Sequence, residues 1–421
     1  MTELIAVSKQ AARRFVLGKQ GLWPGRRWKG RAGTRAAAVA CEHLQLDPLV
    51  IVARSHDLML HGRVVGYEPE LFDELAYKKR LFFDWGGWLA VRPMTELPYW
   101  RTLMQRDRAQ PRMLMIAEHH AEAIAEMRSA LLERGTLSNR ELEATDRSAL
   151  YSYRGAKETS LALYYLWRTG EAMTHHRNGF ERVYAPTEAV APPELVFEAP
   201  DDETDLFMAR KAVAFAGIGR PGPLGEVLVR KVARAEEQTI ERALVERGEI
   251  TPVQVEGGRG NQYVLTADLA HLDEVAREKV PRQWAPLGNT SDEEVALLSP
   301  LDPVHARSRA KILFDFEYVW EIYKKAELVQ FGRYTMPILW GDRLVGRLDP
   351  RLDRKTNTLV INGTWTESAR EARDPAFASA LRLGVQRLMS FLGAERIDAA
   401  AVKSAALRRE LGVLNPKRRR T

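Results

Sequence analysis

The stretch MTHHRNGFERVY, from Met173 to Tyr184, carries the clearest fold signal in the chain. Asn178-Gly179 stands between two strand-like runs, and this dipeptide favours a tight hairpin turn because both residues tolerate a positive φ. The preceding run 160–168 has helical spacing and is followed by Gly170, which is typical of a helix stop. Short helices followed by a two-stranded hairpin are the pattern of a winged helix.

Neighbouring segments extend this pattern. We expect a helix over 111–135 and a short helix beginning at Ser138. A second set then follows, with helices over 205–216, 224–229 and 236–247 and strands over 251–256 and 261–265. The recurrence predicts tandem modules.

The two ends of the chain complete a predicted α+β fold. Ser8 is expected to cap a helix over 8–20 and Thr34 a second helix, before a strand over 44–52 and a helix over 53–61. Strands over 335–340, 343–348 and 358–361 and a closing helix over 375–393 predict a small C-terminal β-barrel-like module. The expected domains are winged helix-turn-helix units at 1–110, 111–197 and 204–280, the β-rich module at 295–400 and a basic tail at 415–421.

Basic residues are distributed unevenly. The 421 residues include 63 Lys and Arg against 56 Asp and Glu, a formal charge of +7. No acid occurs between Lys9 and Arg35, so no local carboxylate can pair with the cations there, and phosphate is a partner that such segments often meet. The basic tail at 417–420 fits a solvated surface equally well.

The cysteine, the apolar residues and the histidines limit the classes of function that this chain can have. Cys41 is the single cysteine, so no internal disulfide forms, which fits a reducing cytoplasm. No secretory signal is visible, and no apolar run reaches the roughly 18 residues of a membrane span. The histidine pairs at 119–120 and 175–176 are sequence neighbours whose side chains should point apart, so we expect no metal site and no cofactor.

The tripeptide Gln45-Leu46-Asp47 is the strongest candidate for chemistry. In a strand, Gln45 and Asp47 share one face while Leu46 points to the other. A carboxylate about 4 Å from a cationic sugar stabilises it by roughly 4 kcal/mol at an effective dielectric of 20, or about a thousandfold in rate. This suits hydrolysis of a glycosidic bond through an oxocarbenium-like state, with the amide orienting water. Alone, the tripeptide fits a polar surface strand better.

Three ordered blocks resemble the AlkZ/YcaQ family of winged-helix DNA glycosylases. The first is HLQLDPL at 43–49 with RSHDLMLHGR at 54–63. The second is LSPLDP at 298–303 with FDFEY at 314–318, and the third is MPILWGDRLVGRLDP at 336–350. The family pattern for the first block is approximately LG-x-V-Q-I-D followed by R-A-H-x-x-x-L-W-S-R, so His61 replaces a Trp.

The resemblance implies a cofactor-free enzyme that excises N7-alkylguanine from duplex DNA and unhooks alkylation interstrand crosslinks. Gln45-Leu46-Asp47 places the chain with the YcaQ-like, also called AlkX-like, branch and implies Gln45 and Asp47 as the catalytic pair. We expect a monofunctional, monomeric enzyme of the bacterial cytoplasm, associated with the nucleoid. The expected DNA contacts are Arg13, Arg14, Lys19, Arg26, Arg27, Arg35, Arg54, His56, Arg63, Arg177 and Asn178. For Arg54, His56 and Arg63 the alternative is a structural ion pair with Asp57 or another acid.

Other function classes stay open at this point. A non-catalytic winged-helix regulator fits the wings and the basic segments equally well, but gives no reason for Gln45 and Asp47 to share a face. A nuclease would usually need a cluster of acids for Mg²⁺, and none stands out. The glycines at 217–222 match G-x-G-x-x-G, but a helix precedes them, so we interpret them as a helix C-cap and turn.

Overall fold

The computed structural model describes residues 4–86, 89–141, 147–148, 156–258, 260–306 and 309–415. The chain divides into two units, each made of separate stretches of sequence. The first comprises Met1–Phe72, Ala214–Gly219 and Thr251–Thr421, and the second comprises Asp73–Val213 and Arg220–Ile250. None of the helices in the described ranges has the length and apolar character needed to cross a membrane. The predicted basic tail falls almost wholly outside the described residues.

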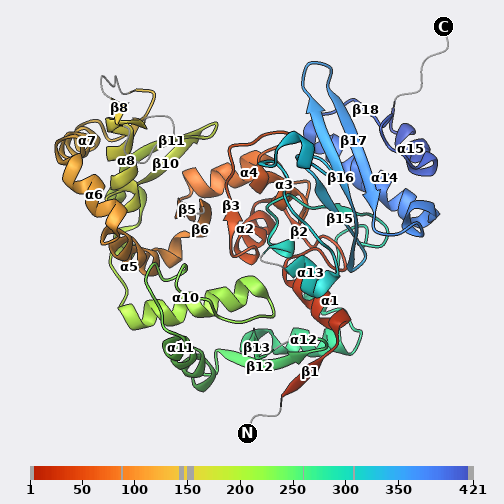
Figure 1. The fold of residues 1–421 in the computed structure, drawn as a ribbon, viewed down its shortest axis with the longest axis horizontal. Coiled ribbons are helices and arrows are strands. Elements are labelled where there is room, and N and C mark those ends of the chain that lie inside the picture. Colours follow the sequence, from red (N-terminus) through yellow and green to blue (C-terminus); the bar gives the residue numbers. More distant parts are fainter. Residues whose placement is uncertain are drawn as a thin grey trace. The chain divides into compact units, whose positions relative to one another are not determined.

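The second unit contains helices and a small antiparallel sheet (Figure 1). In this sheet β10 (Ala172–Asn178) pairs with β11 (Glu181–Pro186), and β11 pairs with β7 (Leu137–Ser138). The other elements are α5 (Leu97–Arg108), α6 (Pro111–His119), α7 (Ala121–Arg134), α8 (Glu158–Arg168), α9 (Thr187–Val190), α10 (Asp201–Ala216), α11 (Arg234–Glu246), the hairpin β5 (Phe82–Trp85) and β6 (Ala90–Pro93), and the pair β8 (Arg147–Ser148) and β9 (Ala156–Lys157).

The predicted β10–β11 hairpin is present, with its turn shifted by one residue. Asn178 pairs with Glu181, so the two loop residues are Gly179 and Phe180. Gly179 has a φ of +64°, and the first loop position is where a type II′ turn requires glycine. Where the sequence predicted the start of a short helix, Ser138 instead pairs with β11 as part of β7 and residues 139–141 form a turn; the continuation of the predicted helix lies outside the described residues.

Two further predictions for this region have clear outcomes. The helix predicted over 224–229 is wrong: the segment forms turns, and the Leu224 N–H donates to the Glu237 carboxylate at 2.8 Å. The interpretation of the glycine motif is confirmed, because α10 ends at Ala216 and Gly217 follows with a φ of +72°. This is a helix C-cap rather than a phosphate-binding loop.

The N-terminal part of the first unit is helical. Ser8 caps α1 (Lys9–Lys19) by accepting from the Ala11 N–H at 3.1 Å, as predicted. Thr34 caps nothing: it lies inside α2 (Gly30–Ala40), where its hydroxyl donates to the Gly30 carbonyl at 2.9 Å. The remaining elements here are β2 (Trp28–Lys29), β3 (Leu44–Gln45), α3 (Ser55–His61), β4 (Val64–Val65) and α4 (Pro69–Asp73).

A three-stranded sheet lies beside these helices. β1 (Ile5–Val7) runs parallel to β12 (Ile250–Val255), which neighbours β13 (Gln262–Leu265). The predicted pair of strands after 250 is therefore present and gains a third strand from the N-terminus. Helices α1 and α12 (Leu269–Ala276) contribute Phe15 and Leu272 to the core under this sheet.

A five-stranded sheet forms the rest of the first unit. Its order is β14 (Ala296–Leu297), β15 (Met336–Trp340), β16 (Arg343–Asp353), β17 (Thr358–Thr366) and β18 (Arg396–Asp398). Because β14 and β18 are separate edges, the sheet is a curled half-barrel rather than a closed barrel. The long hairpin β16–β17 and the closing helix α14 (Pro375–Leu392), drawn in blue, stand beside each other in Figure 1. Helices α13 (Arg309–Phe314) and α15 (Ala405–Gly412) complete a mixed α+β fold, as predicted.

Candidate active site

Gln45 ends β3, and Asp47 lies two residues later. Leu44 and Leu46 are 1% and 3% exposed, whereas Gln45 and Asp47 are partly exposed. This alternation agrees with an amide and a carboxylate that share the face opposite Leu46. The strand predicted over 44–52 is too long, because Asp47 starts a turn in which its Oδ1 accepts from the Leu49 N–H at 2.8 Å.

Both candidate residues have polar atoms that make no hydrogen bond to another described residue. Within the described ranges, neither the Gln45 amide nor Oδ2 of Asp47 has a hydrogen-bond partner. Partial burial raises the pKa of Asp47 above its ordinary value, and the hydrogen bond from the Leu49 N–H opposes this shift. The pair can therefore receive a water molecule or a substrate group.

The segment after Asp47 packs along the half-barrel. The Ile51 carbonyl accepts from the Leu352 N–H at 3.4 Å, and the Val52 carbonyl accepts from Arg354 at 3.1 Å. Val52 also belongs to the same hydrophobic core as Tyr334, which is 3% exposed. Burial, followed by the negative charge of Asp47, raises the pKa of the Tyr334 phenol.

Sequence analysis did not single out Tyr334, whose phenol responds to the charge of Asp47. The available signal was its place immediately before the family-like block at 336–350. No periodicity connects it with Asp47, because 287 positions separate the two residues.

The N-terminal cations, which have no local acid, have acidic partners from distant sequence, and this weakens the argument that phosphate is needed to pair with them. The partners are Asp342 for Arg14 (2.9 Å) and Arg13 (3.8 Å), Asp268 for Lys19 (2.5 Å) and Glu294 for Arg26 (3.1 Å). Arg27 donates to the Lys19 carbonyl at 3.3 Å and lies 4.2 Å from the centre of the Trp28 ring. A contact of these residues with phosphate stays a prediction.

The basic residues that follow the candidate pair lie beside acids, as the alternative expected, and the two arginines form structural ion pairs. Arg54 Nε lies 2.5 Å from Oδ2 of Asp57, and His56 lies 3.8 Å from the same carboxylate. Arg63 is 0% exposed and donates to both oxygens of Asp302, at 2.8 and 2.9 Å. A phosphate contact by Arg63 does not agree with this burial, because the guanidinium has no access to solvent.

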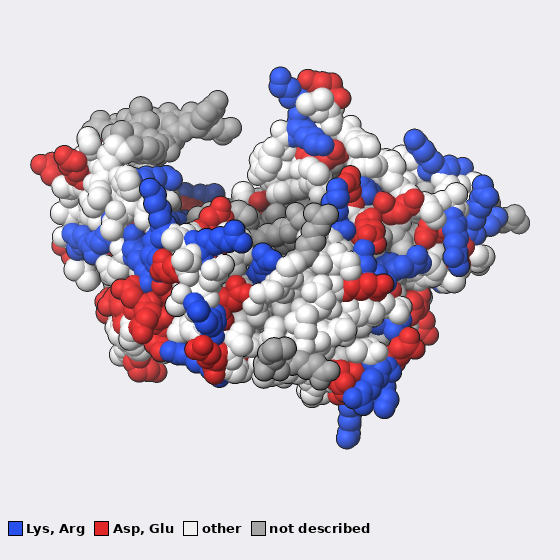
Figure 2. Space-filling model, turned by 60° about the horizontal axis from the view of Figure 1, so that its bottom comes forward, with Lys and Arg blue, Asp and Glu red and all other residues white. Residues whose placement is uncertain are grey.

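The remaining predicted DNA contacts differ in their exposure. Arg177 is held by Asp84 at 2.7 Å with its side chain 6% exposed, whereas Asn178 next to the hairpin turn is exposed. Arg35 is exposed on α2 and has no acidic partner within the described residues. On the face shown in Figure 2, Lys and Arg are interspersed with Asp and Glu instead of forming one basic area.

A model of the AlkZ-like DNA glycosylases matches residues 38–391, which is most of the chain. The chain belongs to this family. The matched span contains Gln45, Asp47 and Tyr334. Among solved structures, the chain is similar to a DNA glycosylase AlkZ from Streptomyces sahachiroi, with a TM-score of 0.62 and 15% sequence identity over 95% of this chain and 100% of that one.

Family membership assigns the general activity. An AlkZ-like DNA glycosylase acts in DNA repair and hydrolyses N-glycosyl bonds, with DNA as its substrate. The structural similarity shows that the overall fold is shared. The segment Lys9–Arg35 lies before the span matched by the family model.

The His175–His176 pair of this AlkZ-like chain departs from its predicted geometry. The two Nδ1 atoms lie 2.8 Å apart, although the rings were expected to point apart. The reason is a β-bulge between Thr174 and His176, which breaks the alternation of side chains along β10. No group of three or more metal-binding side chains occurs within the described ranges.

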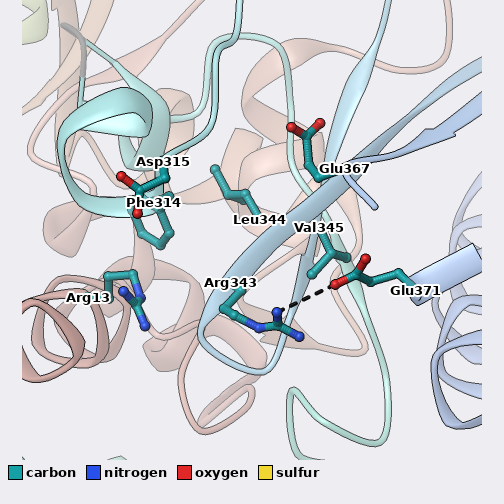
Figure 3. A pocket seen from close by; sticks show the side chains of 8 residues that line it. All are labelled: Arg13, Phe314, Asp315, Arg343, Leu344, Val345, Glu367 and Glu371. Atoms are coloured by element: carbon teal, nitrogen blue, oxygen red, sulfur yellow. Dashed lines mark hydrogen bonds and ion pairs between the residues drawn. The ribbon is translucent and has the colours of Figure 1, made fainter. Parts of the chain in front are cut away.

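A pocket of about 160 Å³ lies elsewhere in the first unit (Figure 3). It is lined by Arg13, Phe314, Asp315, Arg343, Leu344, Val345, Glu367 and Glu371. Arg343 lies 3.5 Å from Glu371, so opposite charges in the lining partly neutralise each other. Neither Gln45 nor Asp47 lines this pocket.

Proposed function

We propose that this AlkZ-like protein is a monofunctional DNA glycosylase that hydrolyses the N-glycosidic bond of N7-alkylguanine and unhooks alkylation interstrand crosslinks. The observation that carries the proposal is the arrangement at β3. Leu44 and Leu46 are buried, while Gln45 and Asp47 are partly exposed and retain polar atoms that have no hydrogen-bond partner among the described residues. We further propose that the protein acts as a monomer in the bacterial cytoplasm. We also propose that the helix–hairpin segments are winged helices that bind duplex DNA, with the domain boundaries predicted from the sequence.

The chemistry follows from the charges of the reacting groups. N7-alkylation makes guanine cationic, so the base leaves without needing a strong general acid. As the bond between C1′ and N9 breaks, positive charge grows on the sugar, and the Asp47 carboxylate stabilises that charge. Gln45 orients a water whose oxygen bonds to C1′ and whose proton passes to Asp47 and then to solvent. The products are the free alkylated base and an abasic site.

A product assay on defined substrates tests this proposal. The substrates are duplexes with one N7-methylguanine or one guanine–guanine crosslink, and the readouts are released base and unhooked strand. Asp47→Asn should slow base release by about a hundredfold to a thousandfold, and Gln45→Ala should also slow it. Asp202→Asn, which removes an exposed acid on α10, is the matched control.

Three results would contradict parts of the proposal. Base release by Asp47→Asn at the wild-type rate removes the catalytic assignment. Trapping of a covalent DNA adduct by borohydride shows a lyase, not a monofunctional enzyme. DNA binding without release of any alkylated base leaves the regulator hypothesis.

A further inference from the structure

Tyr323 is an aromatic side chain that the fold leaves almost entirely in solvent. It is 81% exposed, the largest exposed fraction among the large hydrophobic side chains of the described ranges. A single exposed ring is common on protein surfaces, so exposure alone does not indicate a function. What distinguishes Tyr323 is the structure that holds it and the charges that surround it.

A buried carboxylate fixes the loop 321–333, which carries Tyr323. Glu321 is 2% exposed; its Oε1 accepts from Lys324 at 2.7 Å, and its Oε2 accepts from the Phe331 N–H at 2.8 Å. The Lys324 N–H also donates to the Glu321 carbonyl at 3.0 Å, so Tyr323 occupies the third position of a four-residue turn. One side chain therefore ties the two ends of the loop together, and the exposed ring stands on an ordered base.

Basic side chains lie next to this ring. Arg333 donates to the Ile322 carbonyl at 3.3 Å, which places its guanidinium beside the residue that precedes Tyr323. Arg333 and Lys325 are exposed and have no acidic partner among the described residues. Glu327 is also exposed on this loop, so the two cations outnumber the exposed acid. An exposed aromatic ring beside cations is the combination with which proteins stack on nucleic-acid bases and contact their phosphates.

The end of the loop lies on the same strand as the segment that follows Asp47. A Cβ on Gly332 would collide with the Asp349 carboxylate, so the loop meets β16 at this residue. Three residues further along β16, the Leu352 N–H donates to the Ile51 carbonyl at 3.4 Å. Three residues of a strand span about 10 Å. The loop and the segment that continues from the candidate pair are therefore neighbours along β16.

We propose that Tyr323 stacks on an unstacked base of the substrate DNA, while Arg333 and Lys325 contact the phosphates beside that base. A fully paired stack leaves no free base face, and a damaged nucleotide is where unpairing costs least. Stacking is tolerant of sequence because every base has a π-face, so this contact favours distorted DNA without selecting a sequence. The inference rests on the part of the proposed function that makes duplex DNA the substrate.

The test is the affinity of the full chain for two duplexes of the same sequence, one fully paired and one with a single unpaired base, measured by fluorescence anisotropy. Tyr323→Ala should weaken binding to the duplex with the unpaired base about tenfold, the size of one base–aromatic stack, and binding to the paired duplex less than about twofold. Tyr323→Trp keeps a stacking ring and should retain wild-type affinity. The matched control is Phe197→Ala, which removes another exposed ring (51%) and should leave both affinities unchanged.

Several outcomes would overturn the inference. An equal loss of affinity for both duplexes, or a loss in Tyr323→Trp as large as in Tyr323→Ala, shows that the ring does not stack on a base. A wild-type chain that is dimeric in light scattering, with a monomeric Tyr323→Ala variant, shows that the ring contacts a second copy instead. Unchanged affinities in Tyr323→Ala beside base release by the wild-type chain overturn this inference alone. Absence of base release by a wild-type chain whose binding depends on Tyr323 overturns the proposed glycosylase activity and leaves the DNA contact in place.

Discussion

At the scale of single residues, Asp47 combines two opposing requirements. Its ionised form is the useful one, yet burial raises the pKa of Asp47 above 3.8, so folding favours the protonated form. A carboxyl with a raised pKa in the fold lowers stability as pH rises from its unfolded pKa through its folded pKa. At neutral pH the ionised Asp47 therefore destabilises the protein.

Asp47→Asn should remove this loss of stability, because the amide carries no charge. We expect a rise in melting temperature of about 1–2 °C at neutral pH, and no rise at a pH well below the unfolded pKa, together with the loss of base release. Differential scanning fluorimetry at both pH values measures this. A fall in melting temperature at neutral pH would show that the carboxylate is stabilising.

At the scale of elements, α1 depends on a glycine inside the helix. Replacing a helix glycine with alanine usually stabilises by about 1 kcal/mol. A Cβ on Gly18, however, would lie 2.1 Å from the Trp284 ring. Gly18→Ala should instead destabilise by about 1–3 kcal/mol, because the ring must move. The control is Gly412→Ala in α15, where a Cβ meets nothing within 4 Å and should be neutral or stabilising. Thermal unfolding of both variants shows whether each substitution lowers or raises the stability of the protein.

Sequence predicted elements where the cause is local. The Ser8 cap and the alternation of Leu44 and Leu46 depend on neighbours within a few positions, and both are confirmed. The acidic partners of Arg14 and Lys19 lie 328 and 249 positions away, so no local pattern could reveal them. Tyr334 was missed for the same reason. The strand predicted over 44–52 was too long because a side-chain hydrogen bond of Asp47 turned the chain.

At the scale of the whole molecule, a fully buried ion pair joins distant parts of the first unit. Arg63 and Asp302 are both 0% exposed, and Arg63 also donates to Gln20 at 3.1 Å. Asp302→Asn leaves a buried guanidinium uncompensated and should destabilise by about 3–5 kcal/mol, whereas replacing both residues with apolar ones of similar volume should cost less. Chemical denaturation of the single and double variants measures this. Equal losses of unfolding free energy in the single and the double variant would show that Arg63 and Asp302 are not energetically coupled.

We expect the cations that are already paired with acids to add little to the salt dependence of DNA binding. Each phosphate neutralised by a free cation contributes about −0.9 to the slope of log affinity against log salt concentration. Arg35 is exposed and has no acidic partner within the described part of the chain, whereas Lys19 is paired with Asp268. Arg35→Ala should therefore reduce the magnitude of the slope by about 0.9, while Lys19→Ala should change it little. Fluorescence anisotropy titrations of an undamaged duplex at several salt concentrations give both slopes. The ion pair with Asp268 must break before Lys19 can contact phosphate. An equal change of slope in the two variants would therefore mean that DNA displaces such ion pairs. The whole N-terminal segment would then be part of the binding surface.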